Sequence, residues 1–297
     1  MIGNRFSIKD VEVLTGVKQH TLRVWEQRYN VPQPKRTATN IRYYTDSDLK
    51  VLLNIAMLNR IGHKISKIAC LKESEIEKLV LSHIEKSGNT LLQLESLLNA
   101  LMRMDEMAFE TVLSKNISQN GLEQTMSQLV FPFLHRVGMM WQAGCICPTF
   151  EHFFSNLIRQ KIIASIDKLT VKPSHYSDKF VLFLPQGEPH ELGLLYAQYI
   201  IRSHGHQSIY LGQNLPFDCL HTAYNAFHPN YIVSAITTSL KIKDVQDFVN
   251  RLSSGFPKTK IILSGVQLLS RSIHVPKNVS VIEDFDRFIH LIKSIEK

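Results

Sequence analysis

A histidine lies in a turn whose backbone needs only glycine and proline. The apolar run at residues 180–184 ends at Pro185, and the turn that follows carries Glu188, His190 and Gly193. A neutral imidazole binds metal ions through one ring nitrogen, and a carboxylate bonded to the other nitrogen fixes the tautomer and raises the basicity. This turn is therefore a candidate metal site, with His190 as the ligand and Glu188 as its support.

Five short runs rich in β-branched residues predict the sheet that would hold this turn. Segments with helical spacing separate the runs, which are residues 179–185, 208–212, 231–236, 259–265 and 279–283. This alternation is typical of a doubly wound parallel sheet, a Rossmann-like α/β domain, expected here over residues 178–297. Such sheets bind ligands at the carboxyl ends of their strands, and His190, Ser234 and the pair Ser264-Gly265 fall at that edge.

The motifs of common nucleotide-binding and hydrolase folds are missing from the sequence. There is no GxGxxG, no glycine-rich Lys loop and no serine elbow, and the thirteen histidines show no HExxH spacing. Cys145 and Cys147 are one residue apart, but no second Cys or Cys/His pair stands at zinc-site spacing, so small buried thiols are expected. We expect no enzymatic activity.

Four amphipathic segments between residues 75 and 172 predict a helical bundle. The breaks fall at residues 104–105, 117–121 and 144–148. Trp141 closes the third helix, nine residues intervene, and Glu151 and His152 open the fourth, so these side chains are expected at one edge of the bundle. A buried tryptophan and a first-turn glutamate would also be ordinary features of such helices.

The first 42 residues hold eight Lys/Arg against three Asp/Glu, which is more than half of the excess of +8 in the whole chain. Two short helices joined at Gly16 predict a helix-turn-helix, and residues 31–45 predict a β-hairpin wing. A basic domain of this kind indicates a polyanion partner, although a small helical interaction domain is the alternative. Trp25 is expected in the core, and the candidate DNA contacts are His20, Thr21, Arg23, Arg28, Tyr29, Lys35, Arg36, Arg42 and Tyr43.

The N-terminal motifs, in their order along the chain, resemble the winged-helix domain of the MerR (mercury-resistance regulator) family of transcription regulators. The resemblance covers residues 1–72 and rests on "TLRVWEQRY", "PKR" before the wing, "RYYTDSDL" and "IGHKISKI". It implies binding to double-stranded operator DNA as a symmetric oligomer.

The sheet motifs resemble the cobalamin-binding domain of methionine synthase and the corrinoid proteins. That signature is Asp-x-His-x-x-Gly, Ser-x-Leu and Gly-Gly, with about forty and twenty-seven residues between its parts. Here forty and twenty-seven residues separate Glu188-Pro-His190-Glu-Leu-Gly193, Ser234-Ala-Ile236 and Ser264-Gly265. The resemblance implies that His190 is the lower axial ligand of cobalt. It also implies that the two later motifs leave room for the nucleotide tail of the cofactor.

Trp, nine residues, then Glu-His is similar to the cap of light-responsive MerR-type cobalamin regulators. The resemblance implies that Trp141 covers the 5′-deoxyadenosyl group of adenosylcobalamin, with Glu151 and His152 contacting that group or the corrin edge. The residue after Trp141 is Gln142, a poor cobalt ligand, so a bis-histidine product after illumination would need His152 or His135 as the substitute ligand.

The chain as a whole is interpreted as a repressor that senses light through adenosylcobalamin, binds operator DNA and forms a homo-oligomer, a dimer or a tetramer. The sequence has no apolar run of transmembrane length, no signal peptide and only four cysteines, so a cytoplasmic protein is expected. The alternatives are a MerR-type regulator that senses cobalamin or acts without light, and a corrinoid methyl carrier.

Overall fold

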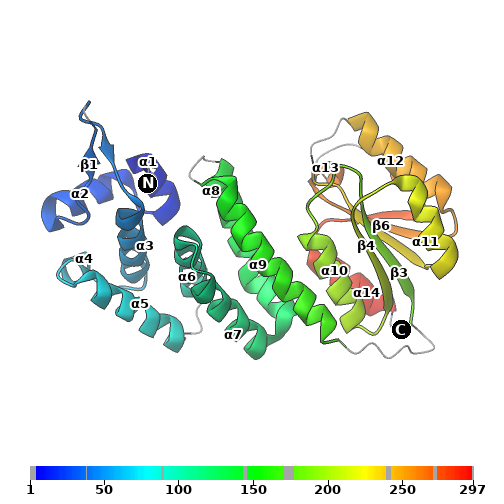
Figure 1. Ribbon diagram of the computed structural model, residues 1–297, viewed down its shortest axis with the longest axis horizontal. Helices are drawn as coiled ribbons and strands as arrows, with labels where there is room; N and C mark the ends of the chain where they lie inside the picture. Colours follow the sequence, from blue (N-terminus) through cyan, green and yellow to red (C-terminus); the bar gives the residue numbers. More distant parts are fainter. Residues whose placement is uncertain are drawn as a thin grey trace. The chain divides into compact units, whose positions relative to one another are not determined.

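Figure 1 shows the computed structural model, which describes residues 5–37, 39–87, 90–142, 146–169, 177–238, 242–269 and 273–295. The chain divides into two compact units, Met1–Leu157 and Ile158–Lys297. Both units bury an apolar core of their own. Among the described residues, no helix combines the length and the apolar character needed to span a membrane.

A winged helix-turn-helix opens the first unit. A capping box begins the first helix, because the Ser7 hydroxyl accepts from the Asp10 N–H and the Asp10 carboxylate accepts from the Ser7 N–H. Gly16 ends this helix with a φ of 73°, a conformation that glycine adopts without strain. Leu14, Leu22 and Trp25 are buried between the helices, as expected for the core. The elements are α1 (Ile8–Thr15), α2 (Gln19–Tyr29), β1 (Lys35–Arg36), β2 (Arg42–Tyr43), α3 (Asp46–Arg60) and α4 (Ile65–Ile68).

Helix α5 (Glu73–Ser87) leads into a bundle that confirms the four predicted helical segments. The bundle consists of α6 (Thr90–Arg103), α7 (Glu106–Thr125) with a π-helical turn (Met126–Val130), α8 (Phe131–Gln142) and α9 (Pro148–Asp167). Edge-to-face contacts of Phe133 with Phe109 and Phe154 fill the core. The expected break near residue 121 is a kink inside α7, where Gly121 has a φ of 76°. Residues 143–145 and 170–172, which include the expected end of the bundle, lie outside the described residues.

The second unit contains the predicted parallel sheet of five strands. Their spatial order is β4-β3-β5-β6-β7. The second strand lies on one side of β3 and the later strands on the other, which is the arrangement of a doubly wound sheet. The strands are β3 (Lys179–Pro185), β4 (Gln207–Leu215), β5 (Tyr231–Ala235), β6 (Lys260–Ser264) and β7 (Val279–Ile282). The expected fold class is confirmed in all three of its parts.

Helices cover both faces of this sheet. One face packs against α11 (Leu220–Phe227), α12 (Ile242–Gly255) and α13 (Val266–Leu269), and its core includes Phe183, Ile236 and Leu263. The other face carries α10 (Leu192–Ser203) and α14 (Phe285–Ile295), which meet where Tyr196 packs edge-on against Phe285. A 3-10 turn (Phe217–Cys219) follows β4. Because β3, β5 and β6 run parallel, their carboxyl ends form one edge of the sheet, and the turn with His190, Ser234 and Ser264 lie there.

Candidate functional site

His190 holds one ring nitrogen in a hydrogen-bond network and leaves the other free. Its Nδ1 lies 2.5 Å from Glu188 Oε1 and 2.9 Å from Thr237 Oγ1. Its Nε2 has no hydrogen-bond partner among the described residues, and 63 % of the side chain is exposed. A ring that donates its Nδ1 proton to a carboxylate keeps a lone pair on Nε2, which is the state that binds a metal.

Glu188 is buried beneath this ring and receives several hydrogen bonds. The backbone N–H groups of Thr237 and Thr238 donate to its Oε2 at 2.5 and 2.7 Å, and the Thr237 hydroxyl donates to Oε1 at 2.8 Å. Burial alone would raise the pKa of Glu188, but these bonds and that of the His190 ring together lower it to about 2. The carboxylate therefore remains ionised at neutral pH and accepts a hydrogen bond from the Nδ1–H group of His190.

Sequence reasoning missed Thr237, which contacts both members of the pair. It stands two residues after the end of β5, and its hydroxyl and its backbone N–H both donate to Glu188. The position of two threonines just after a buried strand was the available signal. A hydroxyl is too common in turns for this signal to identify a site before the strands are aligned.

Strand β4, the neighbour of β3, holds the His190 turn in place. The N–H of Gly187 donates to Asn214 Oδ1 at 2.9 Å, and Gln213 Nε2 donates to the carbonyl of Pro189 at 2.7 Å. Both partners lie at the carboxyl end of β4. The turn is thus fixed at two points directly before His190 by groups from a second strand.

Glu191 extends this network from the residue after His190. Tyr210 donates its hydroxyl to Glu191 Oε2 at 2.8 Å, and Arg159 of α9 forms an ion pair with Glu191 Oε1. Burial, followed by the bond to Glu191, raises the pKa of Tyr210 above its ordinary value. Tyr210 therefore stays protonated and remains a donor to the start of α10.

Strand alternation divides the remaining ligand candidates between the two faces of the sheet. Ile236 belongs to the core beneath α12, and Ser234, two residues earlier, shares that face. The Ser234 hydroxyl is buried and has no hydrogen-bond partner among the described residues. Ser264 follows Leu263 of that same core and therefore lies on the opposite face. Gly193 also lies there, 3.5 Å from the ring of Phe285 when a Cβ is placed on it.

The β5 residues that share a face with Ser264 are therefore Val233 and Ala235. Gly265 has a backbone role, because a Cβ there would stand 2.2 Å from the carbonyl oxygen of Ile236, and its φ is 114°. Only glycine permits the ends of β5 and β6 to approach this closely.

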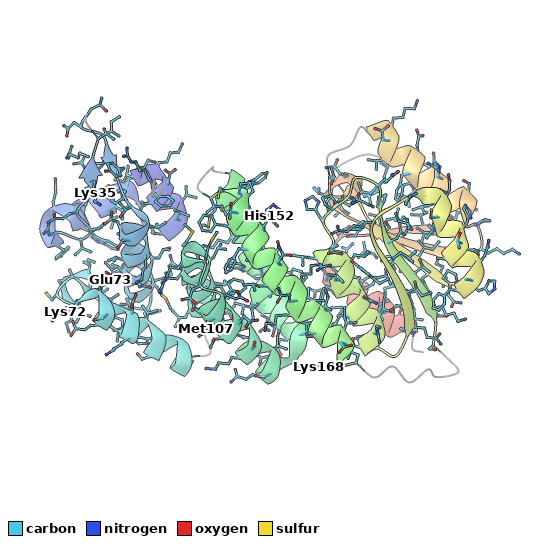
Figure 2. All side chains as sticks on the ribbon, in the orientation of Figure 1. Lys35, Lys72, Glu73, Met107, His152 and Lys168 are labelled. Atoms are coloured by element: carbon cyan, nitrogen blue, oxygen red, sulfur yellow. The ribbon has the colours of Figure 1, made fainter. Side chains whose placement is uncertain are left out.

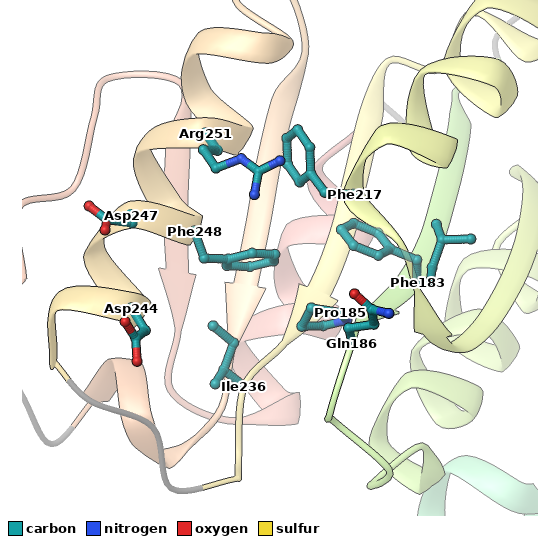
Figure 3. Close-up of a pocket in the computed structure, with 10 residues that line it drawn as sticks. Phe183, Pro185, Gln186, Phe217, Ile236, Asp244, Asp247, Phe248 and Arg251 are labelled. Atoms are coloured by element: carbon teal, nitrogen blue, oxygen red, sulfur yellow. The ribbon is translucent and has the colours of Figure 1, made fainter.

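A cavity of about 310 Å³ opens on the α12 face, at the carboxyl ends of β3 and β5. Figure 3 shows Phe248 pointing into it from α12, while Asp244 and Asp247 point away. Arg251 stacks on the ring of Phe217 with its guanidinium carbon 4.1 Å from the ring centre. Ile236 lines this cavity, and Ser264 and Gly193 do not.

Trp141 is 56 % exposed at the end of α8, which excludes the alternative of a buried structural tryptophan. Glu151 and His152 are exposed on the first turn of α9, and their carboxylate and ring nitrogen lie 3.2 Å apart. Figure 2 labels His152 at this helix start. The indole of Trp141, the Glu151 carboxylate and the His152 ring are thus all accessible at the protein surface.

The expected DNA-contacting side chains lie on α2 and the wing, and their surroundings differ. His20, Arg23 and Arg28 are exposed on α2, with Thr21 and Tyr29 half-buried, and Lys35 and Arg36 are exposed on the wing. Arg36 donates to Asn40 Oδ1 at 2.8 Å across the wing turn. Arg42 instead pairs with Glu26 at 3.6 Å, and Tyr43 lies under the guanidinium of Arg5.

The expectation of a buried thiol is wrong for Cys147, which is exposed, as are Cys70 and Cys219. Cys145 lies outside the described residues. Among the residues that the structure describes, no group of three or more His, Cys, Asp or Glu side chains could hold a bare metal ion. A metal that a macrocycle already coordinates needs only an axial ligand from the protein, and a single oriented imidazole meets that need.

Comparison with known families assigns two segments of the chain. Residues 6–75 match the family described as MerR HTH family regulatory protein, and residues 93–164 match the B12 binding domain family. The second match falls on helices α6 to α9. The chain thus joins a MerR-type helix-turn-helix to a B12-binding domain, which is the domain pair of a B12-dependent DNA-binding regulator.

Two curated relatives extend this result over most of the chain. The HTH-type transcriptional repressor CarH of Myxococcus xanthus is 28 % identical over 267 residues, covering 87 % of each chain. The repressor CarA of the same organism is 26 % identical over 234 residues, covering 76 % of this chain and 74 % of CarA. The chain is homologous to these repressors, and the resemblance drawn from its motifs is confirmed.

A solved structure supports the architecture of the bundle and the sheet. The monomethylamine corrinoid protein of Methanosarcina barkeri superposes with a TM-score of 0.52 at 13 % identity. The superposition covers 66 % of this chain and 95 % of that protein. At this identity the likeness concerns the fold alone.

Proposed function

We propose that this protein is a cytoplasmic, non-enzymatic repressor that binds operator DNA through residues 1–72 and adenosylcobalamin through residues 75–172 and 178–297. The observation that carries the proposal is the His190 ring, whose Nδ1 is held by the buried Glu188 and whose Nε2 is free and exposed. This donor set fits a corrinoid cobalt, because one imidazole with a fixed tautomer is offered and no cage of ligands surrounds it.

When bound, adenosylcobalamin would supply a cobalt ion that takes a nitrogen ligand and a cobalt–carbon bond that light breaks. His190 would hold the cobalt through its Nε2, while Glu188 and Thr237 fix its ring. Trp141 would cover the adenosyl group, with Glu151 and His152 beside it. The exposure of Trp141 supports this role, since its indole is not committed to the core and is accessible to a ligand.

We assign the nucleotide tail to the sheet face that carries Gly193 and Ser264, with Val233 and Ala235 lining it. Small residues at these positions leave room there, whereas Ile236 is committed to the core on the other face. Ser264→Leu should therefore weaken cobalamin binding about tenfold, and Phe248→Leu, in the cavity on the α12 face, should leave it unchanged. The reverse result would assign the tail, with Ser234 and Ile236, to that cavity.

Two recognition helices, contributed by a symmetric oligomer, would read the operator, because one short helix gives too little contact for useful specificity. Arg36 forms no ion pair with an acidic group in the part of the chain that the structure describes, and we assign it to phosphate. Arg36→Ala should reduce the slope of log affinity against log salt by about one, equally for all sequences. Arg42→Ala should change the slope less, because Glu26 already pairs with this side chain.

Light is tested with full-length protein loaded with adenosylcobalamin in the dark. Absorbance spectra, size-exclusion elution and binding to a duplex selected by the dark protein from random sequences are compared before and after green illumination. We expect the spectrum to change, the oligomer to dissociate and DNA to be released. A changed spectrum with identical elution and retained DNA binding would eliminate light and leave the alternative, cobalamin sensing without light. The methyl-carrier alternative is less supported, because a basic DNA-binding domain has no use in it.

A further inference from the structure

A buried charge cluster joins the helix-turn-helix to the bundle within the first unit. Glu95 of α6 is 3 % exposed, and its Oε1 binds Arg60 Nη1 and, at 2.7 Å, Arg136 Nη1. The second nitrogen of each guanidinium donates to a carbonyl at the end of α1, from Arg60 to Thr15 at 2.9 Å and from Arg136 to Leu14 at 3.0 Å. Both arginines thus bridge one carboxylate and one helix end.

The docked end of α1 offsets part of the positive charge of this cluster. Two guanidinium groups face one carboxylate, which leaves an excess of positive charge in a largely buried place. The last carbonyls of α1 carry the negative end of the helix dipole, equivalent to roughly half a charge. The arginines therefore bind the two residues directly before Gly16. Gly16 begins the turn between α1 and the recognition helix α2.

The two arginines have different origins, and this decides what each can do. Arg60 belongs to α3 of the winged domain itself, and α3 is also tied to α6 by the bond from Asn99 to Asn54. Arg136 belongs to α8, so it alone connects α1 with this helix through the cluster. Trp141 stands five residues further along the same helix, about 7.5 Å along its axis.

We propose that Arg136 is a positioning residue for DNA recognition. It transmits the position of helix α8, and thus the state of the Trp141 surface, to the turn of the helix-turn-helix. A rotation or shift of α8 would withdraw one of the two donors from α1 and leave Glu95 paired with Arg60 alone. The regulatory part of this inference rests on the proposed function, while the docking of α1 by Arg136 does not.

The test compares full-length wild type with Arg136→Met, Arg136→Lys and the control Arg103→Met. Methionine keeps the apolar stem, and lysine keeps the charge but lacks the fork that reaches Glu95 and Leu14 together. Arg103 is an exposed arginine of α6 whose one ion-pair partner within the described ranges is Asp105. Two readouts are measured in the dark: affinity for the selected duplex with and without adenosylcobalamin, and amide hydrogen exchange of residues 8–29 in cobalamin-free protein.

We expect the wild type and Arg103→Met to bind DNA at least tenfold more tightly with adenosylcobalamin than without it. In Arg136→Met this ratio should fall below about threefold, and exchange in residues 8–29 should accelerate about tenfold. Arg136→Lys, which keeps the bundle folded, should show the same loss in milder form. Wild-type ratio and protection in both Arg136 variants would overturn the inference.

Failure of the proposed function gives a different pattern. If the wild type itself binds DNA equally with and without cobalamin, the sensory function is refuted and the exchange data alone decide the role of Arg136. Faster exchange in the Arg136 variants then supports docking of α1, and unchanged exchange refutes it.

Discussion

Glu188 and Glu95 are both buried, with 2 % and 3 % of their surface exposed, yet their partners differ in kind. Glu188 receives backbone N–H groups, a hydroxyl and a ring from residues within its own sheet edge. Glu95 receives two arginines that reach it from other helices, and its Oε2 has no hydrogen-bond partner among the described residues. The neutral donors around Glu188 fix one side chain in one orientation. The long arginine side chains around Glu95 connect separate helices.

This contrast predicts that Glu95 matters more for stability than Glu188 does for the same change. Glu95→Gln leaves two facing guanidinium groups without their carboxylate, and breaking such a cluster should cost about 2 kcal/mol of unfolding free energy, reduced from the fully buried case because both arginines are partly exposed. Urea unfolding at neutral pH measures this cost. Equal losses in Glu95→Gln and Glu188→Gln would erase the distinction between fastening and orienting.

For cobalamin binding the order should reverse. His190→Ala removes the proposed nitrogen ligand and should weaken adenosylcobalamin binding about tenfold or more. Glu188→Gln keeps the ligand with a poorer acceptor and should cost less, while Glu95→Gln should leave affinity unchanged. Titration followed by the visible spectrum measures all three. Unaltered affinity and an unaltered spectrum in His190→Ala would rule out ligation by this residue.

Acid should weaken the cobalamin-free protein through Glu188. Its pKa is lowered from 4.5 to about 2 in the folded state, so the stabilisation is complete above pH 4.5 and is lost as the pH falls toward 2. Between pH 6 and pH 3.5 the unfolding free energy of the wild type should fall by about 1 kcal/mol more than that of Glu188→Gln. Parallel pH curves for the two proteins would show that the folded carboxylate is not held ionised.

The smallest effect is expected from Thr237, which contributes one hydroxyl among several donors. Thr237→Val removes the bonds from Oγ1 to Glu188 and His190 but keeps the backbone donor, and should weaken cobalamin binding about threefold. Thr237→Ser restores the hydroxyl and should restore both the affinity and the spectrum. Failure of serine to rescue would mean that the methyl group, and not the hydroxyl, matters at this position.

The sequence predicted the fold well where periodicity decides it. All five strands and the four bundle segments were expected, because apolar spacing and the residues that end each element reveal them locally. The pair of Glu188 and His190 was also predictable, since its members are two residues apart in one turn. The face of each strand residue was harder, and Ser234 and Ile236 lie on the face opposite Ser264 because a shift of one residue reverses the side.

The arginine cluster could not be predicted from local patterns. Arg136 meets Glu95 across 41 residues and Leu14 across 122, so no spacing rule connects them. From sequence alone, an arginine in an amphipathic helix is expected to lie on the solvent-exposed face. Only the packing of α1, α3, α6 and α8 brings the two guanidinium groups and the carboxylate together.

Helix α9 belongs to both compact units, since Leu157 ends one and Ile158 begins the other. The chain is therefore not divisible into cassettes at that boundary. A recombination crossover inside residues 148–167 would join two half-helices from different proteins, each about 10 residues long. A helical segment of this length depends on its packing partners to stay helical, and one half would lose them. Natural exchange of sensory modules between such regulators, and any chimera made in the laboratory, has to inherit this helix whole.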